Sequence, residues 1–183
     1  EAASALQIEP GNAKAHWVLA SVYRDKGLTA PAAEHARQAA AALPGDVRCL
    51  SLAAEVLTRE GLWQEASENL ARALDLAPND PHLLLMMGDC HDALGLDRRA
   101  TEAYLKSADA GPASALPHLR LGAMHVRRGN NEAALQAFRT ATEKDPQNTA
   151  AVKALAMLRL RDDVDAGYRL AEDLYRRAPE DPS

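Results

Sequence analysis

The chain has 183 residues and a formal net charge of −5, from 26 acidic and 21 basic residues. Apolar residues make up 47% of it, which is enough for a sizeable core. No Lys/Arg block is present, which argues against nucleic acid as a partner. No apolar run approaches the roughly 18–20 residues that a membrane span needs, and the first residues lack the basic start and apolar stretch of a secretory signal.

Three residue types recur in this sequence with a step of 34 residues. A fixed period of this length predicts a stacked array of repeats. Four residues of each type keep the register: Gly27, Gly61, Gly95 and Gly129; Ala32, Ala66, Ala100 and Ala134; Pro44, Pro78, Pro112 and Pro146.

The predicted elements follow from this register in chain order. Residues 1–12 are expected to form the second helix of a truncated preceding repeat, and we expect the parent protein to be longer or its copies to associate end to end. Four units of 34 residues follow, and the fifth is irregular because it has Asp163 where the others have glycine. The five predicted units are residues 13–46, 47–80, 81–114, 115–148 and 149–183.

Each unit is predicted to fold as a helix, a tight turn and a second helix. The first helix ends at the glycine, which enters the left-handed conformation without strain. The second helix ends before the proline, which cannot continue a helix. Every unit is preceded by a residue of a type that accepts hydrogen bonds at a helix N-terminus: Asn12, Asp46, Asp80, Ser114 and Asn148.

Small residues at the eighth and twentieth positions of each unit are expected to let the paired helices touch. Larger apolar residues recur beside them with spacings of three and four, which puts them on one helix face. The eighth residues are Ala20, Ala54, Gly88, Gly122 and Ala156, and the larger ones include Leu52, Leu121, Leu155, Leu70, Tyr104 and Phe138.

The pattern resembles the tetratricopeptide repeat, a helix-turn-helix unit of 34 residues. The resemblance is carried by Gly-Leu-Trp-Gln-Glu-Ala at 61–66 with Ala-Leu-Asp-Leu-Ala-Pro at 73–78, and by Gly-Asn-Asn-Glu-Ala-Ala at 129–134 with Lys-Asp-Pro at 144–146. It covers essentially the whole chain. It implies an all-α, right-handed α-solenoid of about five units plus a leading half-repeat, in which the first helices line a concave groove that binds other proteins.

The family resemblance implies which positions of each first helix face the groove. The residues at these positions are polar and of mixed charge in the first two units and apolar in the last two. Such a groove suits an extended peptide or an amphipathic helix. An alternative is that Leu116, Leu119 and Met157 only pack against neighbouring helices. The ten residues selected for the peptide-binding groove are Trp17, Arg24, Arg48, Glu55, His82, Leu85, Asp89, Leu119, Arg127 and Met157.

Other kinds of site find little support in the sequence. The run Asp89-Cys90-His91-Asp92 contains metal-ligand types, but consecutive residues of a helix point about 100° apart and do not converge on one ion. The glycines form no phosphate-binding loop, and no nucleophile is paired with a base. We expect no metal, no cofactor and no catalytic site. Cys49 and Cys90 are interpreted as reduced and buried, which favours a cytoplasmic location.

These observations favour a protein-interaction module that binds a peptide or helix of a partner protein in its groove. Two alternatives stay open. The chain could be the substrate-recruiting arm of a larger enzyme, of the glycosyltransferase or sulfotransferase type, or a scaffold that assembles end to end. The Ala-, Arg- and Asp-rich composition suggests a bacterial source.

Overall fold

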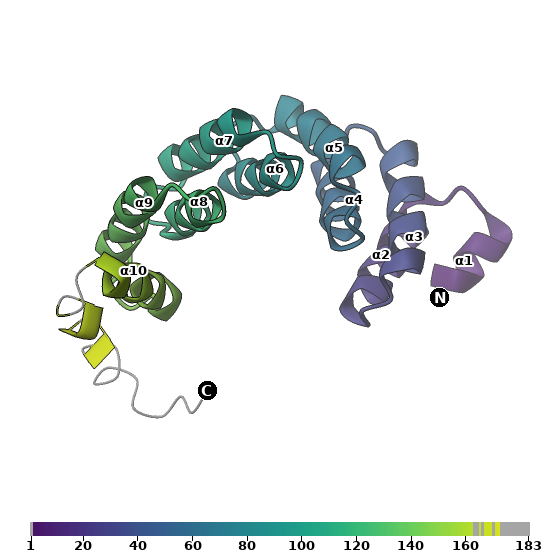
Figure 1. The fold of residues 1–183 in the computed structure, drawn as a ribbon. Helices are drawn as coiled ribbons and strands as arrows, with labels where there is room; N and C mark the ends of the chain where they lie inside the picture. The colour runs from purple at the N-terminus through teal and green to yellow at the C-terminus, as the bar shows by residue number, and fades with distance from the viewer. Residues whose placement is uncertain (1, 163–164, 166, 170, 173–183) are drawn as a thin grey trace. The chain divides into compact units, whose positions relative to one another are not determined.

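The computed structural model describes residues 2–162, 165, 167–169 and 171–172 (Figure 1). These residues form helices and no strand. The fold is the all-α solenoid of helix pairs that the repeat predicts. The turn expected at Asp163 lies outside the described residues, as does most of the second helix of the fifth unit.

The chain forms two compact units, residues 1–103 and residues 104–183. The boundary falls within α7 (Asp97–Ala110), which is the second helix of the third predicted repeat. The predicted division into five repeats stays a prediction, although each predicted repeat up to residue 148 contains two helices.

Unit 1 contains six helices and the start of α7. The first helix α4 contacts the first helices on either side of it, α2 and α6 (Figure 1). The second helix α3 packs against α2 and α4, and the second helix α5 packs against α4 and α6. On these second helices, Arg37 donates two hydrogen bonds to Glu65, at 2.7 and 2.9 Å. The bounds are α1 (Ala2–Ile8), α2 (Ala13–Asp25), α3 (Thr29–Ala42), α4 (Val47–Arg59), α5 (Trp63–Leu76) and α6 (Pro81–Ala93).

Unit 2 contains the end of α7 and three further helices among its described residues. They are α8 (Leu116–Arg127), α9 (Asn131–Lys144) and α10 (Thr149–Asp162). The second helix α9 packs against both first helices, α8 and α10. In both units a second helix therefore packs against the first helices of two successive repeats, as α3 does against α2 and α4.

Side-chain caps begin the first helices, as predicted. Asn12, Asp46, Asp80 and Asn148 accept hydrogen bonds from backbone N–H groups two or three residues later, at 2.8–3.0 Å. Ser114 is the weaker case. Its hydroxyl accepts from the N–H of Leu116 at 3.3 Å, because Ala115 already has helical dihedrals and takes the cap position without a side-chain bond. The start of α8 therefore differs from that of its equivalents.

The four periodic glycines end the first helices. All four have φ between 71° and 77°, and no other described residue has a positive φ. Residues with a Cβ adopt this conformation only at a cost, so the turn requires glycine. The second helices α3, α5, α7 and α9 each end two residues before the periodic proline, as expected.

The core between paired helices is thin because small residues occupy the contact. Ala20, Ala32, Ala54 and Ala66 are fully buried in unit 1. In unit 2 the equivalent contact pairs Gly122 with the ring of Phe138, which is 3% exposed. Cys49 and Cys90 are free and buried, as predicted, and burial raises the pKa of the Cys90 thiol to about 12.

A histidine pair that the sequence did not predict links α2 to α3, the two helices of the first predicted repeat. The Nδ1 atoms of buried His16 and half-buried His35 lie 2.9 Å apart, and His16 Nε2 lies 2.9 Å from the carbonyl oxygen of Pro10. A carbonyl only accepts, so Nε2 of His16 donates and its Nδ1 accepts from His35 when the ring is neutral. The ring of Tyr23 stacks on His35 with centroids 5.6 Å apart.

Gly122→Ala should destabilise unit 2, because the added Cβ would meet the Phe138 ring within the core. Overpacking costs typically 1–3 kcal/mol and the gain in helix propensity offsets about 1, so we expect a net loss of up to about 2 kcal/mol in urea unfolding. Gly45→Ala is the control, since nothing lies within 4 Å of its Cβ. Equal stability of the two variants would contradict the packing described here.

Protonation of His35 should weaken unit 1. Burial, with the charge of His16, lowers the pKa of His35 from its usual value, whereas Glu34 acts in the opposite direction. The unfolded chain therefore binds this proton at a higher pH than the folded chain, and the free energy of unfolding falls as pH drops below about 6.5. We expect His35→Asn, which keeps a donor near His16, to show a shallower decline between pH 7.5 and 5.5 in urea titrations. Identical slopes would contradict this assignment.

Candidate binding surface on the first helices

The ten predicted groove residues all lie on first helices, in two sets. Unit 1 holds seven of them, on α2, α4 and α6, and unit 2 holds Leu119 and Arg127 on α8 and Met157 on α10. Each set is described within its own unit.

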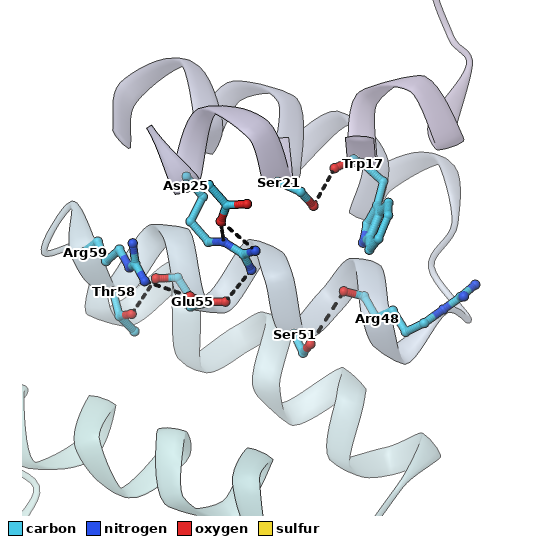
Figure 2. A network of polar contacts seen from close by, with 9 residues as sticks. Trp17, Ser21, Asp25, Arg48, Ser51, Glu55, Thr58 and Arg59 are labelled. Carbon is cyan, nitrogen blue, oxygen red and sulfur yellow. Dashed lines mark hydrogen bonds and ion pairs between the residues drawn. The ribbon is translucent and has the colours of Figure 1, made fainter. Parts of the chain in front are cut away.

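A polar network joins α2 to α4 in unit 1 (Figure 2). Arg24 Nη1 donates to Glu55 Oε2 at 2.9 Å, and Arg59 Nη2 donates to Glu55 Oε1 at 2.9 Å. Arg24 also pairs with Asp25 at 2.9 Å. Burial acts to lower the pKa of Arg24, but the hydrogen bonds and charges of Asp25 and Glu55 raise it. Charges of both signs are therefore held in fixed places on this face.

Hydroxyl groups line the same face but bond to their own helices. Ser21 donates to the carbonyl of Trp17 at 3.0 Å, and Thr58 donates to the carbonyl of Glu55 at 2.7 Å. Figure 2 shows Trp17, Ser21 and Asp25 on one helix, pointing towards the neighbouring helix that carries Ser51, Glu55 and Arg59.

The indole of Trp17 forms one wall of a pocket of about 290 Å³ between the N-terminal ends of α2 and α4. Trp17 is half-buried, and its Nε1–H is buried without a hydrogen-bond acceptor among the described residues. An unsatisfied buried donor costs about 1–3 kcal/mol. The other lining residues are Lys14, Leu43, Asp46, Arg48 and Cys49.

Arg48 and Asp46 form an ion pair at the rim of this pocket, 2.8 Å long. Hydrogen bonds from the side chain and then the backbone of Arg48 lower the pKa of Asp46 to about 2, against the effect of burial. With this pKa, Asp46 is ionised near neutral pH. It caps α4 through the N–H of Arg48 and pairs with the Arg48 side chain, which is 81% exposed.

The three predicted groove residues on α6 differ in their exposure to solvent. His82 is exposed and Asp89 is half-buried, whereas Leu85 is only 9% exposed. Leu85 therefore belongs to the apolar core of α6, with Leu83, Leu84 and Met86. This burial leaves little of its side chain to meet a ligand, and its role as a contact residue stays a prediction.

Unit 2 has an open pocket of about 430 Å³ between α8 and α10. Met157 is its most prominent member, with 67% of its surface exposed. Phe138, from the second helix α9, is buried behind the first helices. The lining residues are Ala123, Val126, Arg127, Phe138, Ala154, Met157 and Leu158.

The alternative interpretation was that Leu116, Leu119 and Met157 only pack against neighbouring helices. The structure describes different surroundings for the three residues. Leu119 is half-buried and packs against the core clusters that contain Phe138 and Ala141. Leu116 is 37% exposed and Met157 is 67% exposed, so part of each side chain remains accessible to a ligand. Five pocket residues that the sequence did not select carry the ordinary apolar pattern of a helix and give no signal of their own: Ala123, Val126, Phe138, Ala154 and Leu158.

Among the described residues, no group of three or more His, Cys, Asp or Glu side chains is placed to hold an ion. Cys90, from the run Asp89-Cys90-His91-Asp92, is fully buried. No helix in the described part of the chain is long and apolar enough to cross a membrane.

Solved structures with this fold are similar to the chain over most of its length. PilW, a type IV pilus biogenesis factor, is 19% identical with a TM-score of 0.82, over 99% of this chain and 84% of PilW. MamA from Desulfovibrio magneticus RS-1 is 19% identical (TM-score 0.78, 93% and 97% covered). YrrB, described as a repeat protein with an unusual peptide-binding site, is 15% identical (TM-score 0.69, 98% and 93% covered).

A search of curated protein sequences gives no match. The family model for the tetratricopeptide repeat matches residues 52–115 and 119–182, which together are more than half of the chain. With the helix pairs, the left-handed glycine turns and the solved structures of the same fold, this shows that the chain belongs to the tetratricopeptide repeat family.

Proposed function

We propose that this chain is a protein-interaction module that holds a peptide or helix of a partner protein against its first helices. The observation that carries the proposal is that, in each unit, an open pocket lies against the first helices and places exposed apolar surface beside charged side chains. Tetratricopeptide repeats are a fold known for protein–protein interaction, and the solved structures of similar fold include one described as peptide-binding.

The unit 1 surface supports this role through the residues around Trp17. A large aromatic side chain that is partly exposed can cover an apolar side chain of a ligand. The charges of Arg24, Glu55 and Arg48 are already ordered by hydrogen bonds, so less entropy is lost when a ligand meets them.

Eight of the ten predicted groove residues remain in the proposed binding face. Leu85 and Leu119 are assigned to the packing behind it, because the first is buried and the second contacts core clusters. Charges at the rim are expected to set the register of the ligand, while burial against Trp17 or Met157 supplies affinity. Binding of this kind requires no catalysis by the chain itself.

Selection from a random-peptide library displayed on phage, with the 183-residue chain as bait, tests the proposal. We expect enriched peptides to lose affinity in at least one first-helix variant, Arg48→Glu in unit 1 or Met157→Glu in unit 2. An exposed charge pair contributes up to about 1 kcal/mol, so Arg48→Glu should weaken its peptides roughly fivefold in fluorescence anisotropy.

Glu68→Lys is the matched control. Glu68 is exposed on the second helix α5, where it accepts a hydrogen bond from Gln64. Its reversal should change affinity less than twofold. Circular dichroism would verify that each variant is folded. A library that yields no binding peptide, or peptides that only Glu68→Lys disturbs, would contradict binding on the first helices.

A further inference from the structure

The sulfur-containing side chains of this chain differ widely in their exposure to solvent. The sequence contains four methionines and two cysteines, and all six lie within the described residues. Met86 and Met124 are only 8% and 1% exposed, and Met87 is half-buried against the core of unit 1. Met157 is the exception, with 67% of its surface exposed. Because oxidation follows access to the sulfur, an oxidant in solution should reach the thioether of Met157 first.

The two cysteines do not compete for such an oxidant. A cysteine reacts as its thiolate, but Cys49 is 3% exposed and Cys90 is fully buried. Burial, together with the charge of Asp46, raises the pKa of the Cys49 thiol, whereas Arg48 acts in the opposite direction. Burial raises the pKa of the Cys90 thiol to about 12. Both cysteines therefore stay protonated and shielded near neutral pH.

Met157 also supplies much of the apolar surface that the open pocket of unit 2 offers to a ligand. The residues that line this pocket are apolar except for Arg127. Among them Val126 is 40% exposed, whereas Phe138 and Leu158 are only 3% and 5% exposed. The flexible and polarizable thioether of Met157 is suited to contact apolar side chains of varied shape.

A peroxide converts this thioether to a sulfoxide in one balanced step. The sulfur of Met157 attacks one oxygen of the peroxide, the O–O bond breaks and an S–O bond forms. The proton on the transferred oxygen passes to the departing hydroxide, which leaves as water. The sulfur is oxidised by two electrons, and the peroxide is reduced by the same two. The product is a polar, chiral side chain in place of a flexible apolar one.

The sulfoxide should change the pocket and leave the fold intact. At the exposed position of Met157, water can hydrate the new oxygen while the pocket is empty. A ligand that covers the pocket with an apolar side chain removes this water, and a polar group buried without a hydrogen bond costs free energy. Oxidation therefore opposes binding of an apolar side chain rather than folding.

We propose that Met157 is a peroxide-sensitive modification site, and that its oxidation lowers the affinity of the unit 2 pocket for apolar side chains. The second part rests on the proposed function and gives its unit 2 site a means of regulation. The modification is reversible, because methionine sulfoxide reductases restore the thioether.

Peptide mapping by mass spectrometry, after brief treatment of the full chain with hydrogen peroxide, tests the site of oxidation. We expect the Met157 sulfoxide to form roughly tenfold faster than those of Met86 and Met124, and several-fold faster than that of Met87. In concentrated urea, which exposes all four methionines, the rates should become equal. Faster oxidation of another sulfur in the folded chain, or equal rates there, would overturn the assignment.

The effect on binding is measured with the library peptides that Met157→Glu weakens. Oxidation confined to Met157 should lower their affinity roughly fivefold or more in fluorescence anisotropy, and methionine sulfoxide reductase should restore it. Met157→Leu is the matched variant, because leucine keeps an apolar side chain of similar size that peroxide does not oxidise. It should bind these peptides and be insensitive to peroxide. Peptides that only Arg48→Glu weakens should keep their affinity after oxidation.

The outcomes separate this inference from the proposed function. An unchanged affinity of the Met157 sulfoxide, or an equal loss in peroxide-treated Met157→Leu, would overturn the regulation and leave peptide binding intact. A selection that yields no peptide sensitive to Met157→Glu would overturn the proposed function in unit 2, and the effect of oxidation on binding with it. The mapping still decides, independently, whether Met157 is the site of oxidation.

Discussion

The close contact between the two helices of each repeat is the constraint on which the other features depend. Fully buried alanines at Ala20, Ala32, Ala54 and Ala66 leave the paired helices separated by little more than their backbones. A large side chain fits into that contact where the facing residue has no Cβ, as Phe138 against Gly122 shows. The core is therefore a thin layer, and first helices keep one face turned away from their partners. That face can carry side chains chosen for binding, since packing does not determine them.

Turn and cap chemistry could be predicted from the sequence because each requires a particular residue type at a fixed place. Glycine at Gly27 or Gly61 is dictated by a φ above 70°, and Asp46 or Asp80 by backbone N–H groups that need an acceptor. These are local requirements that the 34-residue period repeats. The same reasoning was less successful at Ser114, where a helical Ala115 intervenes.

Burial along the first helices was harder to predict, because some positions lie at the boundary between the core face and the open face. At the fifth position of a repeat, Leu85 is buried, Leu119 is half-buried and Lys153 is exposed. A small rotation of the helix about its axis, or a smaller neighbouring side chain, determines whether such a residue is buried or exposed. The period of the sequence does not specify either of these. The ninth position is more consistent, since Glu55, Asp89 and Met157 all keep contact with solvent. The histidine pair of His16 and His35 was missed for a related reason, because it joins residues 19 apart on two helices.

The two units distribute charge in different ways, and this bears on how a repeat protein acquires specificity. In unit 1 the acidic partners of Arg24, Arg59 and Arg48 belong to the same surface, so a ligand there meets charges of both signs that are already ordered. In unit 2, Arg127 borders a pocket that is lined mainly by apolar residues of α8 and α10. Because the paired alanines already hold the helices together, charges on the open face can differ from unit to unit at little cost to stability. One fold can thus present a preordered polar surface in one unit and a mainly apolar surface in the other.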